Sequence, residues 1–235
     1  MTDNGNQLQL TRSRAAVIAG IGLVINMIVA FIAFFAILPG IIGTGDVAIT
    51  FANLLASEQQ LRIAIFLLTL NFIVDIVVFW ALYYFLKPVS KSISLLALLF
   101  GGMHVIVGLL SISNLTSLLH MASRAAFDSA LDAAMFHAQA AVAIDAFNWA
   151  WQAGFVIFGI HLFLRGGLFF KAGYMKKWLG IALLIAAAGY LMDGFGQMLM
   201  SGYNIPVVGY VGILEAILAV WLLVEGRKIG IGGQE

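Results

Sequence analysis

The sequence predicts an all-α integral membrane protein, a bundle of six transmembrane helices. Of its 235 residues, 63% are apolar and only 10% are charged, whereas soluble domains are about half apolar and about one quarter charged. The apolar residues also fall into six stretches of the length that a bilayer core of about 30 Å requires. The formal net charge of +1 argues against nucleic acid as a partner. The absence of cysteine excludes disulfides and thiolate chemistry.

Six apolar stretches account for most of the chain. The expected spans are residues 15–38, 61–86, 92–113, 142–165, 178–200 and 206–225. The first follows Arg12 and Arg14 and is much longer than the apolar region of a secretory signal, which has about 7–15 residues. We therefore expect it to stay in the mature protein as an anchor. This divides the chain into an N-terminal tail (1–14), a membrane domain (15–225) and a C-terminal tail (226–235).

Basic residues orient the expected spans. Only Arg62 and Arg124 fall in the loops of one side. The other ten fall at the termini or in the second and fourth loops: Arg12, Arg14, Lys87, Lys91, Arg165, Lys171, Lys176, Lys177, Arg227 and Lys228. Because basic residues are enriched in cytoplasmic loops, we expect both termini in the cytoplasm and the chain in the cytoplasmic membrane of a bacterium.

Residues 114–141 form the longest expected connection. Polar residues recur there nearly every four positions, the spacing of one helix face: Ser117, His120, Arg124, Asp128 and Asp132. We therefore expect an external amphipathic helix after the third span, lying on the membrane surface or capping the bundle.

Polar side chains also fall inside the expected spans, where an ionisable group costs at least a few kcal/mol and needs a partner or a purpose. At about 1.5 Å per residue from the cytoplasmic end of each span, one group lies about 15–18 Å deep: Asn26, Asp75, His104 and Glu215. Asn71 precedes Asp75 by four residues and shares its face. A second group lies about 20–30 Å deep on the same measure: Asp145, Asn148, Gln152, Asp193 and Gln197. The spacings within both groups are typical of stripes that face the bundle interior.

These stripes have a functional and a structural interpretation. In the first they line a polar cavity where Asp75, Glu215 and His104 bind a cation, relay protons or hold the polar end of a lipophilic ligand, oriented by Asn26 and Asn71. In the second they are hydrogen-bonded contacts between helices. Three ionisable groups at one depth exceed what helix adhesion usually employs. We therefore expect a protein without catalysis that binds or translocates a small cation, proton or lipophilic molecule within the lipid bilayer.

Two other classes stay open: an intramembrane metal- or cofactor-dependent enzyme acting on a lipid, and a structural or regulatory subunit with no ligand. Asp75, His104 and Glu215 are acceptable metal ligands by type, but they form no short spacing motif. The sequence has no Gly-x-Ser-x-Gly elbow or phosphate loop, so no catalytic residue, metal or cofactor follows. A haem between His104 and His161 is disfavoured because their estimated depths differ by about 12 Å. We expect His161, near the cytoplasmic boundary, to bond to a neighbouring helix or a lipid headgroup.

Short strings in a fixed order carry a family resemblance. They include Leu38-Pro39, Gly45-Asp46, Asn53-Leu54-Leu55, Leu61-Arg62, Leu86-Lys87-Pro88-Val89, Phe158-Gly159-Ile160-His161-Leu162, Lys171-Ala172-Gly173-Tyr174 and Gly189-Tyr190-Leu191. Together they resemble the bacterial membrane proteins grouped as domain of unknown function 4386, over about residues 12–228. Members commonly have a proline and an arginine where this chain has Met175-Lys176-Lys177. The resemblance implies a fold and a membrane location but no agreed activity, so no site residue follows from it.

Overall fold

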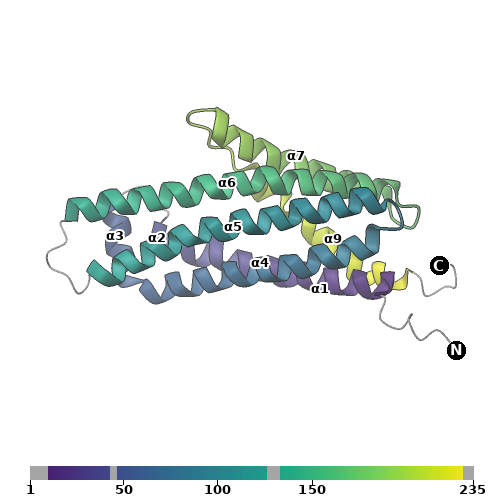
Figure 1. Cartoon of the computed structure of the whole chain (residues 1–235), viewed down its shortest axis with the longest axis horizontal. Coiled ribbons are helices and arrows are strands. Elements are labelled where there is room, and N and C mark those ends of the chain that lie inside the picture. The colour runs from purple at the N-terminus through teal and green to yellow at the C-terminus, as the bar shows by residue number, and fades with distance from the viewer. Residues whose placement is uncertain (1–9, 43–46, 126–132, 230–235) are drawn as a thin grey trace.

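A computed structural model describes residues 10–42, 47–125 and 133–229. Six helical runs in this part of the chain are long and apolar enough to cross a membrane, and they lie side by side as an elongated bundle (Figure 1). The helices are α1 (Arg12–Phe31), the π-helix η2 (Ile32–Ile37), α2 (Leu38–Ile42), α3 (Val47–Ala56), α4 (Glu58–Leu86), α5 (Lys91–Ala125), α6 (Ala133–Lys171), α7 (Lys177–Leu199), α8 (Val207–Val211), α9 (Ile213–Val224) and the 3₁₀ turn η3 (Gly226–Lys228). The predicted all-α class with six spans is confirmed, and the chain is a multi-pass membrane protein.

The expected external helix after the third span is not a separate element in the described residues. Instead α5 continues without a break through Ala125, and α6 begins at Ala133. Residues 114–125 contain neither proline nor glycine, so nothing in the sequence ends the helix there. The polar spacing that begins at Ser117 and His120 therefore belongs to the continuation of α5. Asp128 and Asp132 lie outside the described residues.

The spans follow one another around the bundle in chain order. α1 packs against α4, α4 against α5, α5 against α6 and α6 against α7, and α9 returns to α1. The ring closes less extensively between α7 and the α8–α9 segment. The molecule is thus a ring of six helices with one loosely packed boundary, between α7 and α9.

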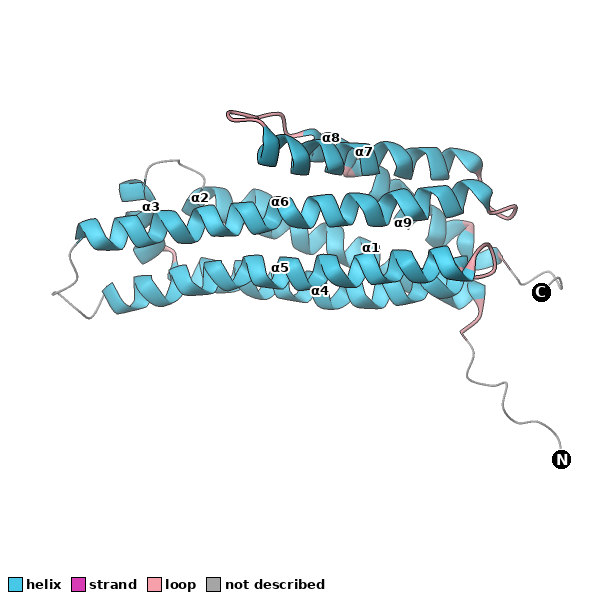
Figure 2. Ribbon diagram, turned by 45° about the horizontal axis from the view of Figure 1, so that its top comes forward, coloured by secondary structure: helices cyan, strands magenta, loops and turns pink. Residues whose placement is uncertain are grey.

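Both ends of the described chain lie at the same end of the bundle. The hydroxyl of Ser13 donates a hydrogen bond to the carbonyl oxygen of Arg227. The turns that join α4 to α5 and α6 to α7 lie at this end as well (Figure 2). There the Tyr174 hydroxyl donates to the carbonyl oxygen of Phe85 over 2.8 Å. We call this end the terminal end, and the opposite end, where α5 stops and α6 starts, the distal end.

Glycines bring α6 and α7 into backbone contact. A Cβ atom added at Gly180 of α7 would lie 2.5 Å from the backbone nitrogen of Phe170 and 2.8 Å from the carbonyl oxygen of Gly166. Such distances are far below van der Waals contact, and backbone atoms cannot move aside as a side chain can. Only glycine therefore fits at position 180, as is typical of close helix contacts in membranes.

We expect Gly180→Ala to lower the free energy of unfolding by about 1–3 kcal/mol, because the added methyl overpacks the contact. Gly167→Ala is the matched control on the facing helix, since a Cβ there meets nothing within 4 Å. It should leave stability unchanged or raise it by up to about 1 kcal/mol through better helix propensity. Unfolding in mixed detergent micelles measures both, and equal effects of the two substitutions would contradict the prediction.

Candidate functional site

An interior cavity of about 980 Å³ lies within the ring of helices. Its walls come from α1, η2, α4, α6, α7, α8 and α9, with His104 contributed by α5. Eight of the ten residues singled out from the sequence line it: Asn26, Asn71, Asp75, His104, Gln152, Asp193, Gln197 and Glu215. Polar residues of both groups, which the sequence predicts at two different depths, thus line one cavity.

Asp145 and Asn148 do not line this cavity, and both are exposed. The expectation that their stripe faces the interior is wrong for these two residues. Asp145 shares a helix face with Gln152, but it lies two turns nearer the distal end. Gly194 of α7 packs on the backbone of Gln152, and beyond that point α7 diverges from α6 (Figure 1). No neighbouring span of this part of the chain therefore covers α6 at Asp145.

Asp75 lies at the contact between α4 and α1 and is only 7% exposed. The Asn26 side-chain amide donates to its Oδ1 over 2.7 Å, and the Asn71 amide donates to its Oδ2 over 3.3 Å. Each carboxyl oxygen thus receives one amide hydrogen. The Oδ1 atom of Asn26 is buried and has no hydrogen-bond partner among the described residues. Asn26 therefore uses its donor on Asp75 and leaves its acceptor free.

Glu215, in the first turn of α9, contributes a second carboxyl group to the same cavity. The Tyr190 hydroxyl of α7 donates to its Oε1 over 2.8 Å. The Tyr190 ring packs edge-on against Phe155 and Phe158, with centroids 5.2 and 4.9 Å away. This hydrogen bond therefore ties α7 to α9 across the loosely packed boundary of the ring.

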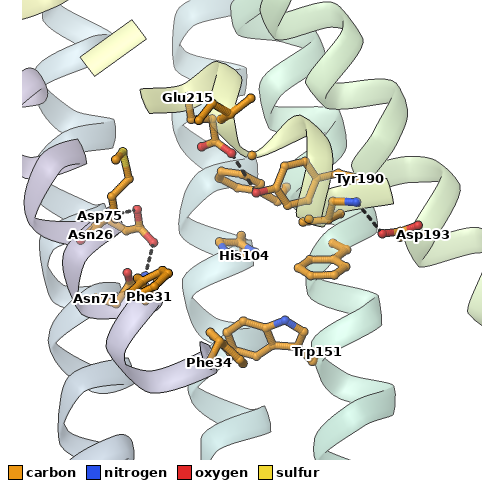
Figure 3. A pocket seen from close by; sticks show the side chains of 18 of the residues that line it. Asn26, Phe31, Phe34, Asn71, Asp75, His104, Trp151, Tyr190, Asp193 and Glu215 are labelled. Carbon is orange, nitrogen blue, oxygen red and sulfur yellow. Dashed lines mark hydrogen bonds between the residues drawn. The ribbon is translucent and has the colours of Figure 1, made fainter. Parts of the chain in front are cut away.

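His104 places an imidazole among these groups (Figure 3). Its Nδ1 lies 3.0 Å from the carbonyl oxygen of Gly154. Because a carbonyl oxygen can only accept, Nδ1 carries a proton, and in the neutral form of the ring Nε2 keeps a lone pair. The rings of Phe72 and Phe158 lie 5.5 and 4.6 Å from the imidazole. One hydrogen bond and two ring contacts thus orient His104 within an aromatic wall.

Arg165 is the residue of this site that the sequence reasoning missed. The sequence predicts a cytoplasmic loop position for it at the end of the fourth span, but α6 continues to Lys171. Arg165 is only 4% exposed and lines the cavity, with its guanidinium carbon 4.9 Å from the Phe79 ring centroid. The signal was present in the sequence, because the apolar run resumes after the arginine as Gly-Gly-Leu-Phe-Phe. The helix ends with this run and not at the charge.

The same boundary error misplaced His161. It is fully buried, so the headgroup alternative is wrong, and its Nδ1 lies 2.6 Å from the carbonyl oxygen of Ala97 on α5, which confirms the expected bond to a neighbouring helix. A Cβ at Gly101, one turn before His104, would lie 2.8 Å from the His161 ring. The two histidines therefore differ in depth by about one turn, about 5 Å, and not by the larger distance estimated. In the described ranges no three histidine or carboxylate side chains are placed to hold a metal ion.

Asp193 and Gln197 hold the segment that precedes α8. Asp193 Oδ1 accepts from the Tyr203 hydroxyl over 2.8 Å and from the Val207 backbone nitrogen over 3.1 Å. Its Oδ2 accepts from the Val208 nitrogen over 2.7 Å, and the Gln197 amide donates to the Tyr203 carbonyl oxygen over 3.0 Å. Both side chains line the cavity, but their hydrogen bonds are spent on positioning α8.

Comparison with known proteins places the chain in a family. The family model described as Domain of unknown function (DUF4386) matches residues 18–226. The chain belongs to this family. An uncharacterized protein of Archaeoglobus fulgidus is 36% identical to it over 157 residues, which cover 67% of this chain and 80% of that protein. No solved structure was found to match the chain. The family resemblance is confirmed, and because this relative is archaeal, a bacterial origin does not follow from it.

We expect the Asn26–Asp75 hydrogen bond to stabilise the contact between α1 and α4. A double-mutant cycle with Asn26→Ala and Asp75→Ala should give a coupling free energy of about 1 kcal/mol, the usual size for such bonds in membrane bundles. The control cycle pairs Asn71→Ala with Asp75→Ala and should give less, because that bond is longer. A coupling near zero for Asn26, measured by reversible unfolding in micelles, would show that the bond adds no stability.

Proposed function

We propose that the chain binds a lipophilic molecule with a polar end in this cavity, as a membrane-embedded binding or transport protein and not as an enzyme. The observation that carries the proposal is the contrast between the two ends of the cavity. Its interior holds Asp75, Glu215 and Arg165, whereas most of the large exposed side chains that line it are apolar, beside the polar Gln197 and Asn204. This is the arrangement that an amphipathic molecule entering from lipid requires.

The rim of the cavity lies between the distal turns of α1 and the segment that contains α8. Its large apolar side chains are all more than one third exposed: Met27, Ile28, Phe31, Phe35, Ile205 and Ile213. The side chains of α8 include none that is buried. In a membrane span such side chains face hydrocarbon, so a molecule dissolved in the bilayer would reach the cavity sideways without crossing water. The π-helix η2, which carries Phe34 and Phe35, lies at this rim, and π-helical turns are frequent at functional sites.

The walls favour a lipophilic molecule over a bare ion. Most of the lining is aliphatic or aromatic, and a minority of polar groups converges in it, which is the usual composition of a small-molecule site. The volume is also at the upper end of the range for such sites, about 300–1,000 Å³. A purely structural role for the polar residues does not account for the cavity. Hydrogen bonds that only hold helices together require the helices to be in contact, and they do not require an empty volume between them.

Blocking the rim tests this proposal. Gly209 of α8 lines the cavity, and a Cβ there meets nothing within 4 Å, so Gly209→Trp should fill the opening without strain. We expect saturable binding of pyrene probes to the wild-type chain in lipid nanodiscs, read by tryptophan-to-pyrene energy transfer, and about tenfold weaker binding to Gly209→Trp.

The matched control is Gly102→Trp on α5, where a Cβ also meets nothing within 4 Å but which does not line the cavity. It should bind the probes as the wild type does. If the wild-type chain binds no pyrene probe saturably, whatever the probe's head group, the proposed function is wrong.

We further propose that the terminal end faces the cytoplasm and that the membrane is the cytoplasmic one. Basic residues support this orientation. Arg165 no longer counts because it lies inside the bundle, but nine others belong to the terminal end: Arg12, Arg14, Lys87, Lys91, Lys171, Lys176, Lys177, Arg227 and Lys228. Arg62, near the start of α4, lies at the distal end, where it pairs with Glu58 over 2.6 Å.

Single cysteines test the orientation, because the chain has no cysteine of its own. Gln59 at the distal end and Lys176 at the terminal end are both exposed. A membrane-impermeant maleimide should label Gln59→Cys in intact cells and Lys176→Cys only after the cells are opened. The reverse pattern would invert the proposed orientation.

A further inference from the structure

We infer that the polar end of the bound molecule is a cation, and that the cavity takes a protonated lipophilic amine. This inference rests on the proposed function, since it names the class of molecule that the cavity binds. Three independent features of the lining support it: its charges, its free hydrogen-bond acceptors and its aromatic faces.

The first feature is the balance of charge. Two carboxyl groups, of Asp75 and Glu215, face the same cavity as one guanidinium group, of Arg165. Both carboxyl groups are hydrogen-bonded by neutral donors, which are side-chain amides at Asp75 and a phenol at Glu215. The ion pairs found in the described ranges lie on the surface, at Glu58–Arg62 and Glu225–Lys228. When both carboxyl groups are ionised, these three groups carry one net negative charge in a region of low dielectric, which a bound cation would balance.

Asp193 adds a third carboxyl group to the lining. Its two oxygens accept hydrogen bonds from the Tyr203 hydroxyl and from two backbone nitrogens. These neutral donors do not cancel the charge of a carboxylate, so an ionised Asp193 adds to the negative excess, but they occupy both of its oxygens. Asp75 and Glu215 are therefore the carboxyl groups that a bound cation would meet.

The second feature is an excess of acceptors. The Oδ1 atom of Asn26 and the Oε1 atom of Gln152 are buried, and neither has a partner in the part of the chain that is described. In the neutral imidazole the Nε2 atom of His104 adds a lone pair, since Nδ1 donates to Gly154. An alkylammonium group brings several N–H donors and no acceptor. A carboxylate or phosphate head would bring acceptors alone and leave these atoms unsatisfied.

The third feature is the aromatic wall. Rings of Phe72, Trp151, Phe155, Phe158 and Tyr190 line the cavity around the polar groups. The electron-rich face of an aromatic ring attracts a cation, most strongly where water is excluded. The same rings provide an apolar surface for the body of the molecule. An amine carried on a lipophilic skeleton would thus use both parts of the lining.

Three probes that differ only in head group test the charge: pyrenemethylamine, pyrenemethanol and pyrenecarboxylate, bound at neutral pH to the full chain in phosphatidylcholine nanodiscs. We expect the amine to bind about tenfold more tightly than the alcohol, and the carboxylate to bind least. Asp75→Asn and Glu215→Gln should each weaken amine binding by about tenfold and leave alcohol binding unchanged. Glu225→Gln, at an exposed acid outside the cavity, is the matched control and should change neither.

The outcomes separate the two proposals. Equal, saturable binding of the amine and the alcohol would overturn the cationic ligand and leave the lipophilic site standing. Tightest binding of the carboxylate would also overturn it and make Arg165 the anchor of an anionic head. Absence of saturable binding for all three probes would overturn both. If Asp75→Asn does not fold, Glu215→Gln and the wild-type order of the three probes still decide, because glutamine keeps an acceptor for the Tyr190 hydroxyl.

Discussion

A polar group inside this bundle can find a hydrogen-bond partner in the protein or in a bound molecule but not in the surrounding hydrocarbon. That constraint explains how the ring of helices is held together. Most neighbouring helices are joined across their contact by at least one hydrogen bond that involves a side chain, here called a polar tie. These ties are Asn26–Asp75 between α1 and α4, Ser94–Tyr83 between α5 and α4, His104–Gly154, His161–Ala97 and Ser111–Phe147 between α5 and α6, and Tyr190–Glu215 between α7 and α9. Each tie fixes the rotation of two helices about their axes, and so fixes what else they turn inward.

Close packing holds some neighbouring helices of the ring together, and side-chain hydrogen bonds hold others. Where glycines allow backbones to touch, as at Gly166 and Gly180, α6 and α7 leave no space. Where α7 diverges toward the distal end, the ring closes through the Tyr190–Glu215 bond and the Asp193-anchored α8. The cavity lies at this boundary. The site therefore arises where side-chain hydrogen bonds, and not close packing, complete the bundle.

The sequence predicts most of this fold because bilayer thickness sets the length of each span. It also places Asn26 level with Asp75, since both depths were counted along spans whose ends are clear. It predicts the wrong depth for Arg165 and His161, because α6, with 39 residues, is much longer than a bilayer requires and continues past the charge that would usually end a span. Asp145 was misassigned for another reason. Spacing along a helix tells which residues share a face, but not how far the neighbouring helix extends to cover that face.

The great length of α5 and α6 has a consequence for how the protein meets its surroundings. At about 1.5 Å per residue, their 35 and 39 residues span about 50–60 Å, well beyond a bilayer with its headgroups, about 40–45 Å thick. The short turns at the terminal end confine the excess to the distal side, where Ser117 and His120 are exposed. With the short turns of the terminal end at the membrane surface, the distal ends of both helices would extend past the headgroups. A soluble molecule approaching from that side would then meet these helix ends before the membrane.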